Sequence, residues 1–265
     1  MSFTWYESLE STNIEIKKAI AQNKAENTLF AAFRQTKAYG RQGRCWDSPL
    51  GGLYMSILLR PEDYGVSRKD IPTLSLAISI AIKRVLASRG LKQQTRIKWP
   101  NDVLLSGKKV AGISVELVEG AVCVGIGINV FRPYEKQSPT HDKVDQDCYK
   151  QAYLASFLEF NTKETQVLSD ALSDVQKKII QNLAKNVSAE VYSVYVQWIR
   201  EGFSHLRNEY LESAALLGHK VRLLAISNNV LNEGTVCDIN AQGALVLERD
   251  DGERMCASSG EVHLV

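Results

Sequence analysis

Residues 96–130 constrain the fold of this chain more than any other stretch. Four runs rich in apolar and β-branched residues follow one another there, and the breaks between them hold residues that favour tight turns. The runs are Arg96–Trp99, Val103–Leu105, Lys109–Val118 and Ala121–Val130, separated at Pro100-Asn101, Ser106-Gly107 and Glu119-Gly120. This pattern predicts four successive strands of a sheet.

The residues before this region predict further strands and two helices. Apolar residues in Ile71–Leu86 recur at the spacing of one helical face, which indicates an amphipathic helix. Thr12 and Glu15 fit a capping box, so a second helix is expected to open at Thr12 and run to about Gln22. Strands are predicted at Phe3–Tyr6, Leu29–Gln35 and Leu53–Leu59.

The last third of the chain changes character twice. Residues 132–147 are polar and predict a loop, whereas residues from about 148 to 212 hold no proline and little glycine and predict helix. Leu216–Val265 contains short β-rich runs split by turn residues, at the spacing of a small barrel. We therefore expect two domains, at 1–213 and 214–265.

The composition excludes several classes of protein. A net charge of +2 gives no electrostatic footprint for DNA, RNA or anionic lipid. The five cysteines are scattered without a CxxC pair, which favours reduced thiols in a cytosol over disulfides or a zinc site. The N-terminus lacks the apolar run of a signal peptide, and the most apolar stretch, Leu74–Ile82, is too short to span a bilayer. We expect a cytoplasmic protein without a membrane partner.

The loop at 36–52 carries the first candidate site. It holds four glycines and one proline. It also holds Arg41 and Arg44, and arginine can form bidentate hydrogen bonds with a carboxylate or a phosphate. Glycine lets backbone N–H groups turn toward an anion, and Trp46 offers an apolar plug. The pattern GRxGR by itself also fits a solvated surface loop. Whether the loop binds an anion therefore has to be judged from the neighbouring motifs.

The second candidate site is KWPND at 98–102. A single lysine on a strand is usually a surface charge, but here Trp99 and Pro100 fix the backbone beside Lys98. Asn101 and Asp102 have two interpretations, which are to orient a site or hold magnesium, or to bond the local backbone of a turn.

Other catalytic motifs are excluded or disfavoured. GIGINV at 125–130 lacks the third glycine and the following helix of a dinucleotide fingerprint, so it is interpreted as a strand that a ligand can approach closely. The sequence has no Walker A, HExxH or GxSxG motif. Cys45 and Cys123 have no neighbouring histidine to support a nucleophilic role.

These motifs, together with Ser11-Thr12-Asn13 and KVAGI at 109–113, resemble those of the biotin–protein ligases. The resemblance implies an α+β fold. A catalytic domain of the biotin/lipoate ligase type would hold a mixed sheet with helices packed on one face, and a small SH3-like β-barrel would follow it. Repressor-type members carry a DNA-binding domain ahead of the tripeptide, which begins here at residue 11. We therefore expect a monofunctional ligase that does not bind DNA.

The resemblance also implies the reaction. Biotin would be activated with Mg²⁺ and ATP as biotinyl-5′-AMP and transferred to a lysine of the biotin carboxyl carrier protein of a carboxylase. The protein would act as a monomer or a homodimer. The alternatives are a lipoate or octanoate ligase or transferase of the same fold, and a non-catalytic biotin-binding module.

The residue roles follow from the same resemblance. Lys98 would contact the biotin carboxylate and the α-phosphate, Arg41 would share the catalytic work, and Asp102 is a possible magnesium contact. Tyr39 stands where a further arginine occurs in fuller versions of the loop, which leaves the role of this side chain open. The expected biotin and adenylate contacts are Ser11, Thr12, Asn13, Gln35, Tyr39, Gly40, Arg41, Arg44, Trp46, Lys98, Asn101, Asp102, Gly112, Gly127 and Asn129.

Overall fold

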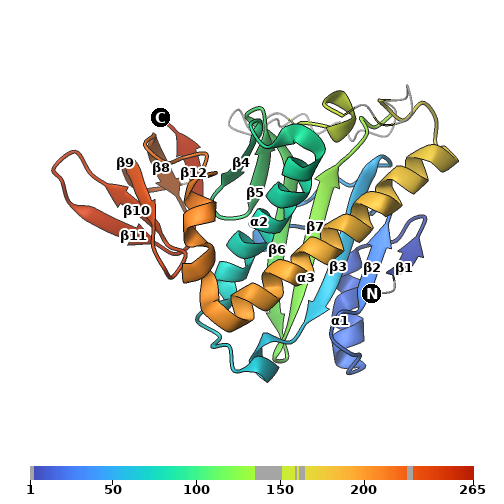
Figure 1. Cartoon of the computed structure of the whole chain (residues 1–265), viewed down its shortest axis with the longest axis horizontal. Helices are drawn as coiled ribbons and strands as arrows, with labels where there is room; N and C mark the ends of the chain where they lie inside the picture. Colours follow the sequence, from blue (N-terminus) through green and yellow to red (C-terminus); the bar gives the residue numbers. More distant parts are fainter. Residues whose placement is uncertain (1–2, 135–150, 159, 161–164, 226–228) are drawn as a thin grey trace.

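A computed structural model describes residues 3–134, 151–158, 160, 165–225 and 229–265. It contains a seven-stranded sheet and a five-stranded sheet (Figure 1). The strands and helices are β1 (Phe3–Tyr6), α1 (Thr12–Ala21), β2 (Leu29–Ala32), β3 (Gly52–Leu59), α2 (Leu74–Leu86), β4 (Thr95–Lys98), β5 (Asp102–Leu105), β6 (Lys108–Val118), β7 (Ala121–Asn129), α3 (Asp174–Leu211), β8 (Lys220–Leu224), β9 (Val230–Ile239), β10 (Leu245–Glu248), β11 (Arg254–Ala257) and β12 (Glu261–Leu264). Single helical turns lie at Arg41–Gly43, Pro61–Tyr64, Ile71–Thr73, Ala87–Leu91 and Leu154–Ser156.

The large sheet is mixed, as expected. Its order is β1-β2-β3-β7-β6-β5-β4, with β1 parallel to β2 and the other neighbours antiparallel. Two of its turns, Ser106-Gly107 and Glu119-Gly120, fall where the sequence places them. All four of these residues have positive φ, the geometry that suits two-residue hairpins.

Helices cover both faces of the large sheet. α2 and α3 pack on one face, over alternate strand residues such as Leu29, Ile57 and Val122 (Figure 1). The intervening residues Phe30, Leu58 and Cys123 point to the other face and form a separate apolar cluster with α1. The expectation of helices on one face therefore holds for α2 and α3 and is wrong for α1.

Two other local expectations are wrong. Helix was predicted from about residue 148, but α3 begins at Asp174, where Ser173 and Gln176 form a reciprocal capping box that starts it. The described residues between 151 and 172 contain a single helical turn and otherwise no helix. Strand β2 ends at Ala32, three residues before the predicted end at Gln35. The loop predicted at 132–147 lies mostly outside the described residues.

The segment Ile71–Leu91 is a core helix of the protein. In length and composition this segment would suffice to cross a membrane, but 72% of its most apolar window is buried inside the protein. Its contacts are with α3 and with strands of the large sheet.

The small sheet is antiparallel, in the order β11-β10-β9-β8-β12, and docks on the last part of α3. Gly202 has a φ of +70° and bends α3, so that its end turns toward this sheet (Figure 1). There the Arg207 guanidinium lies 2.5 Å from both carboxylate oxygens of Asp238. The domain boundary near 214 stays a prediction.

Trp99, which follows β4, also contacts the small-sheet domain, and we expect its loss to be measurable. The indole N–H donates to the Gly243 carbonyl at 2.9 Å, and Trp99 is buried. Trp99→Phe leaves that carbonyl without its donor, so the free energy of unfolding in urea should fall by about 1–2 kcal/mol. Trp5→Phe, on the edge strand β1, is the matched control. Equal stability of the two variants would contradict this role.

Candidate active site

One cavity of about 960 Å³ brings together every residue that the sequence analysis singles out as a contact. It lies on the α1 side of the large sheet, between the N-terminus of α1, the loop at 36–47 and the edge of the small sheet at Gly260–His263. Segments that are more than 200 residues apart in sequence thus share one pocket.

A single row of the sheet carries the charged and the glycine residues. Lys98 pairs with Asp102 across β4 and β5, Asp102 pairs with Gly112, and Gly112 pairs with Gly127. Directly paired residues point to the same face, so the lysine, the carboxylate and two side-chain-free positions lie in line. Lys98 is buried, with 7% of its surface exposed.

The two glycines form a floor that Trp46 covers. A Cβ added at Gly112 or at Gly127 would come within 2.8 Å of the indole, so a larger residue would displace it. The Lys109 ammonium lies 4.8 Å from the centroid of the Trp46 ring. Trp46 Nε1 is buried and has no hydrogen-bond partner among the described residues, although indole N–H groups usually find one.

We expect Gly127→Ala to loosen the loop. The added methyl group cannot fit under Trp46, and overpacking of this kind costs about 1–3 kcal/mol. Cleavage by trypsin after Arg41 and Arg44 should therefore accelerate by about tenfold. In a Trp46→Ala variant the Gly127→Ala substitution should not increase the cleavage rate further. Unchanged cleavage of the single variant would contradict the account of the floor.

The capping box predicted for Thr12 and Glu15 is wrong, because α1 begins differently. Ser11 occupies the N-cap position, and Thr12 is the first helical residue. The backbone N–H and the hydroxyl of Thr12 both donate to Gln35 Oε1, at 2.7 and 3.1 Å. Glu15 instead pairs with Lys18. The Thr12 hydroxyl is thus used to bind the start of the loop rather than to cap the helix.

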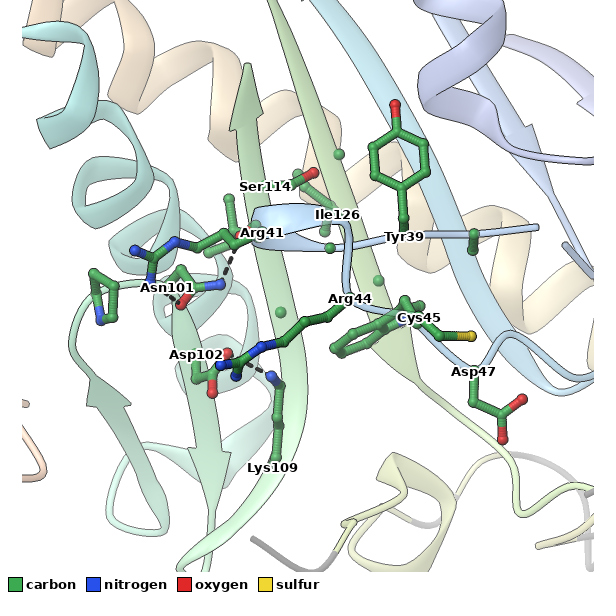
Figure 2. A pocket seen from close by; sticks show the side chains of 18 of the residues that line it. Tyr39, Arg41, Arg44, Cys45, Asp47, Asn101, Asp102, Lys109, Ser114 and Ile126 are labelled. Carbon is green, nitrogen blue, oxygen red and sulfur yellow. Dashed lines mark hydrogen bonds and ion pairs between the residues drawn. The ribbon is translucent and has the colours of Figure 1, made fainter. Parts of the chain in front are cut away.

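The arginines of the loop turn toward different partners. Arg41 Nη1 lies 3.4 Å from Asn101 Oδ1, and Figure 2 shows its side chain directed to that turn. Burial lowers the pKa of the Arg41 guanidinium, while the charges of Asp102 and Glu261 oppose this effect. Arg44 forms an ion pair of 2.5 Å with Glu261 of the small sheet.

The two polar residues of KWPND reach beyond their own turn. Asn101 Nδ2 donates to the Ile113 carbonyl at 2.8 Å, so this side chain is anchored on β6. The Asp102 carboxylate lies 2.6 Å from the Lys109 ammonium (Figure 2). The alternative in which both side chains bond the local backbone is therefore wrong.

Three further predicted residues also line the cavity. Gly40 N–H donates to the Arg44 carbonyl and closes the turn that carries the arginines. Asn129 Nδ2 contacts the Lys109 carbonyl at 3.4 Å. Tyr39 points away from the Arg41 end in Figure 2, and its ring centroid lies 5.2 Å from the Lys17 ammonium.

The disfavoured cysteine mechanism gains no support. Burial raises the pKa of the Cys123 thiol, so this cysteine stays protonated near neutral pH. Cys45 lines the cavity as an exposed residue of the loop.

Sequence reasoning missed several residues of the cavity. Ser114 and Gly125 lie two positions from Gly112 and Gly127, so the period of two along a strand could have placed them on the same face. The motif KVAGI contains Lys109 but assigns this lysine no role of its own. Glu261 and its neighbours come from the small sheet, and no local pattern indicates that this strand meets the loop.

Two family models match the chain. The Biotin/lipoate A/B protein ligase family matches residues 5–130, and the Biotin protein ligase C terminal domain matches residues 216–265. The Biotin--[acetyl-CoA-carboxylase] ligase of Mycobacterium tuberculosis is 30% identical over 261 residues, which cover 95% of this chain and 85% of that protein. The Bifunctional ligase/repressor BirA of Bacillus spizizenii is 38% identical over 133 residues, 47% of this chain and 39% of that protein.

A solved structure extends the comparison to the fold. The biotin protein ligase from Aquifex aeolicus, solved in complex with biotin and ATP, superposes with a TM-score of 0.76 at 22% identity. The match covers 100% of this chain and 99% of that one. The superposition shows the fold, and the family match together with the 30% identical relative places the protein in the biotin/lipoate ligase class. Within that class, the chain belongs to the biotin–protein ligase family.

Proposed function

We propose that this protein is a biotin–protein ligase that activates biotin with ATP and transfers it to a lysine of a biotin carboxyl carrier protein. One observation carries the proposal. Lys98, Arg41 and Arg44 line the same cavity as the floor formed by Gly112 and Gly127, over which the Trp46 ring lies. The family matches agree with it.

In the first step a carboxylate oxygen of biotin attacks the α-phosphorus of ATP. The bond between that phosphorus and the oxygen bridging to the β-phosphate breaks, and pyrophosphate leaves with the electron pair. Two anions must meet for this reaction, and Lys98 neutralises both of them at the end of β4. Arg41 holds the phosphate from the loop. The products are biotinyl-5′-AMP and pyrophosphate.

In the second step the neutral amine of the carrier lysine attacks the acyl carbon. The carbon–oxygen bond to AMP breaks, the amine loses a proton, and an amide forms. Water would hydrolyse the mixed anhydride, so the loop must cover it between the two steps. The cover of Trp46 and Arg41 over the sheet supports this role.

Magnesium would enter with ATP. Among the described residues no three His, Cys, Asp or Glu side chains gather as a metal site. This fits an ion held mainly by phosphates and waters with one or two carboxylates, and Asp102, which pairs with Lys98 across β4 and β5, could supply one of them. The bound ion would neutralise phosphate charge.

We place the enzyme in the cytoplasm, as a monomer or a homodimer. The four cysteines in the described part of the chain are unpaired, in keeping with a reducing compartment.

Exchange of labelled pyrophosphate into ATP tests the proposed function. We expect exchange that depends on biotin and that lipoate or octanoate does not replace. A second assay adds a biotin carboxyl carrier domain, which should become labelled at its lysine. Exchange with lipoate instead would move the protein to the sister activity, and biotin binding without exchange would overturn the enzymatic proposal.

A further inference from the structure

Asn13 is a cavity residue whose side-chain amide is hydrogen-bonded at both its nitrogen and its oxygen. It is buried, with 4% of its surface exposed. Its Nδ2 group donates to Ser114 Oγ and to Glu116 Oε1, each at 3.1 Å. Its Oδ1 accepts from the Ser56 hydroxyl at 2.6 Å. Both N–H groups of the amide therefore have partners inside the protein.

Glu116 decides which way this amide faces. A serine hydroxyl can donate or accept, so Ser56 and Ser114 would tolerate the amide in either orientation. An ionised carboxylate only accepts, so the N–H end of Asn13 has to face Glu116. The oxygen end is then turned toward Gly125, because a Cβ added there would lie closer to Asn13 Oδ1 than to Nδ2, and both Asn13 and Gly125 line the cavity.

Lys17 holds Glu116 in place. Its ammonium lies 2.7 Å from Glu116 Oε2. Partial burial lowers the pKa of Lys17, but the Glu116 carboxylate and the Tyr39 hydroxyl outweigh this effect and raise it above the ordinary value. The same ammonium lies against the Tyr39 ring. One chain of contacts thus joins the Asn13 amide to the loop.

We propose that Glu116, held by Lys17, is a positioning residue that orients the Asn13 amide so that its oxygen accepts an N–H of the biotin ureido ring. Neither Glu116 nor Lys17 is among the described residues that line the cavity, so the pair acts through Asn13. The inference rests on the proposed function and deepens it, because it names the groups that set selectivity for a ring with N–H donors.

Glu116→Gln tests the orientation directly. The carboxamide keeps the size of the side chain, but it can donate as well as accept, so the Asn13 amide is free to turn over. Lys17→Met keeps the chain length and removes the charge. Glu119→Gln is the matched control, since it neutralises an exposed carboxylate on the same hairpin. Thermal unfolding establishes that each variant folds.

The readout is the kinetics of pyrophosphate exchange with biotin and with biotins methylated on either ureido nitrogen. For Glu116→Gln we expect the KM for biotin to rise about tenfold, the value of one hydrogen bond, while the KM for ATP stays within about twofold. The penalty for methylating one nitrogen should shrink by a similar factor. Lys17→Met should also raise the KM for biotin and reduce the methylation penalty. Glu119→Gln should change neither the KM nor the penalty.

Three results would overturn the inference. In active wild-type protein, an unchanged biotin KM and methylation penalty in Glu116→Gln would remove the positioning role and leave the proposed function intact. An equal rise of the biotin and ATP KM values would indicate a general structural effect and would also reject it. Wild-type protein without biotin-dependent exchange would overturn the proposed function, and the inference with it.

Discussion

The Lys98→Ala variant should lose biotin-dependent pyrophosphate exchange by about a thousandfold and keep its fold. Lys98 lies at the end of β4 and pairs with Asp102, and in the proposed mechanism it neutralises the two substrate anions. Removal of one preorganised group that stabilises transition-state charge typically costs a hundredfold to a thousandfold in rate, and here the group also carries a full charge.

The fold should survive because the neighbouring acids keep other partners. Asp102 retains its ion pair with Lys109, and Glu261 retains Arg44. Lys108→Ala, which removes an exposed lysine from the same sheet, is the control. Steady-state exchange and thermal unfolding measure the two effects. Folded Lys98→Ala protein with exchange within tenfold of the wild type would remove Lys98 from the mechanism.

Strong local patterns explain why the core of the fold could be predicted. The apolar face of α2 and the Ser106-Gly107 and Glu119-Gly120 turns act over a few residues, so sequence reasoning places them closely. Residues 151–172 mislead because the absence of proline permits a helix without requiring one. In the structure this stretch instead packs Ala152, Leu154 and Val167 against the core.

In the site, too, the features set by local sequence could be predicted, and those set by tertiary packing could not. Lys98 and the loop arginines belong to short motifs, and the structure gathers all of them in one cavity. The Arg44–Glu261 pair joins residues 217 positions apart, so it depends on how the small sheet docks. Tertiary contact likewise overrides local capping at Thr12, whose hydroxyl bonds Gln35. Local reasoning found the motifs, and packing decided what each side chain contacts.

Arg41→Gly should release the activated intermediate. The Arg41 guanidinium is directed from the loop to Asn101, and burial lowers its pKa, so bringing it into the site has a cost that a bound anion can offset. A charge-assisted hydrogen bond is worth about 1.5–3 kcal/mol, so biotinyl-5′-AMP should leave at least about tenfold faster. Rapid separation of protein from free adenylate measures this rate, and an added bystander protein should become biotinylated.

Two further variants separate the charge of Arg41 from the flexibility that glycine introduces. Arg41→Met removes the charge and keeps an ordinary side chain, so it should release adenylate nearly as fast as Arg41→Gly. Lys37→Gly introduces the same backbone freedom at an exposed position of the loop and should retain adenylate as the wild type does. Fast release from Lys37→Gly with slow release from Arg41→Met would show that loop stiffness, not the guanidinium, keeps the anhydride in the site.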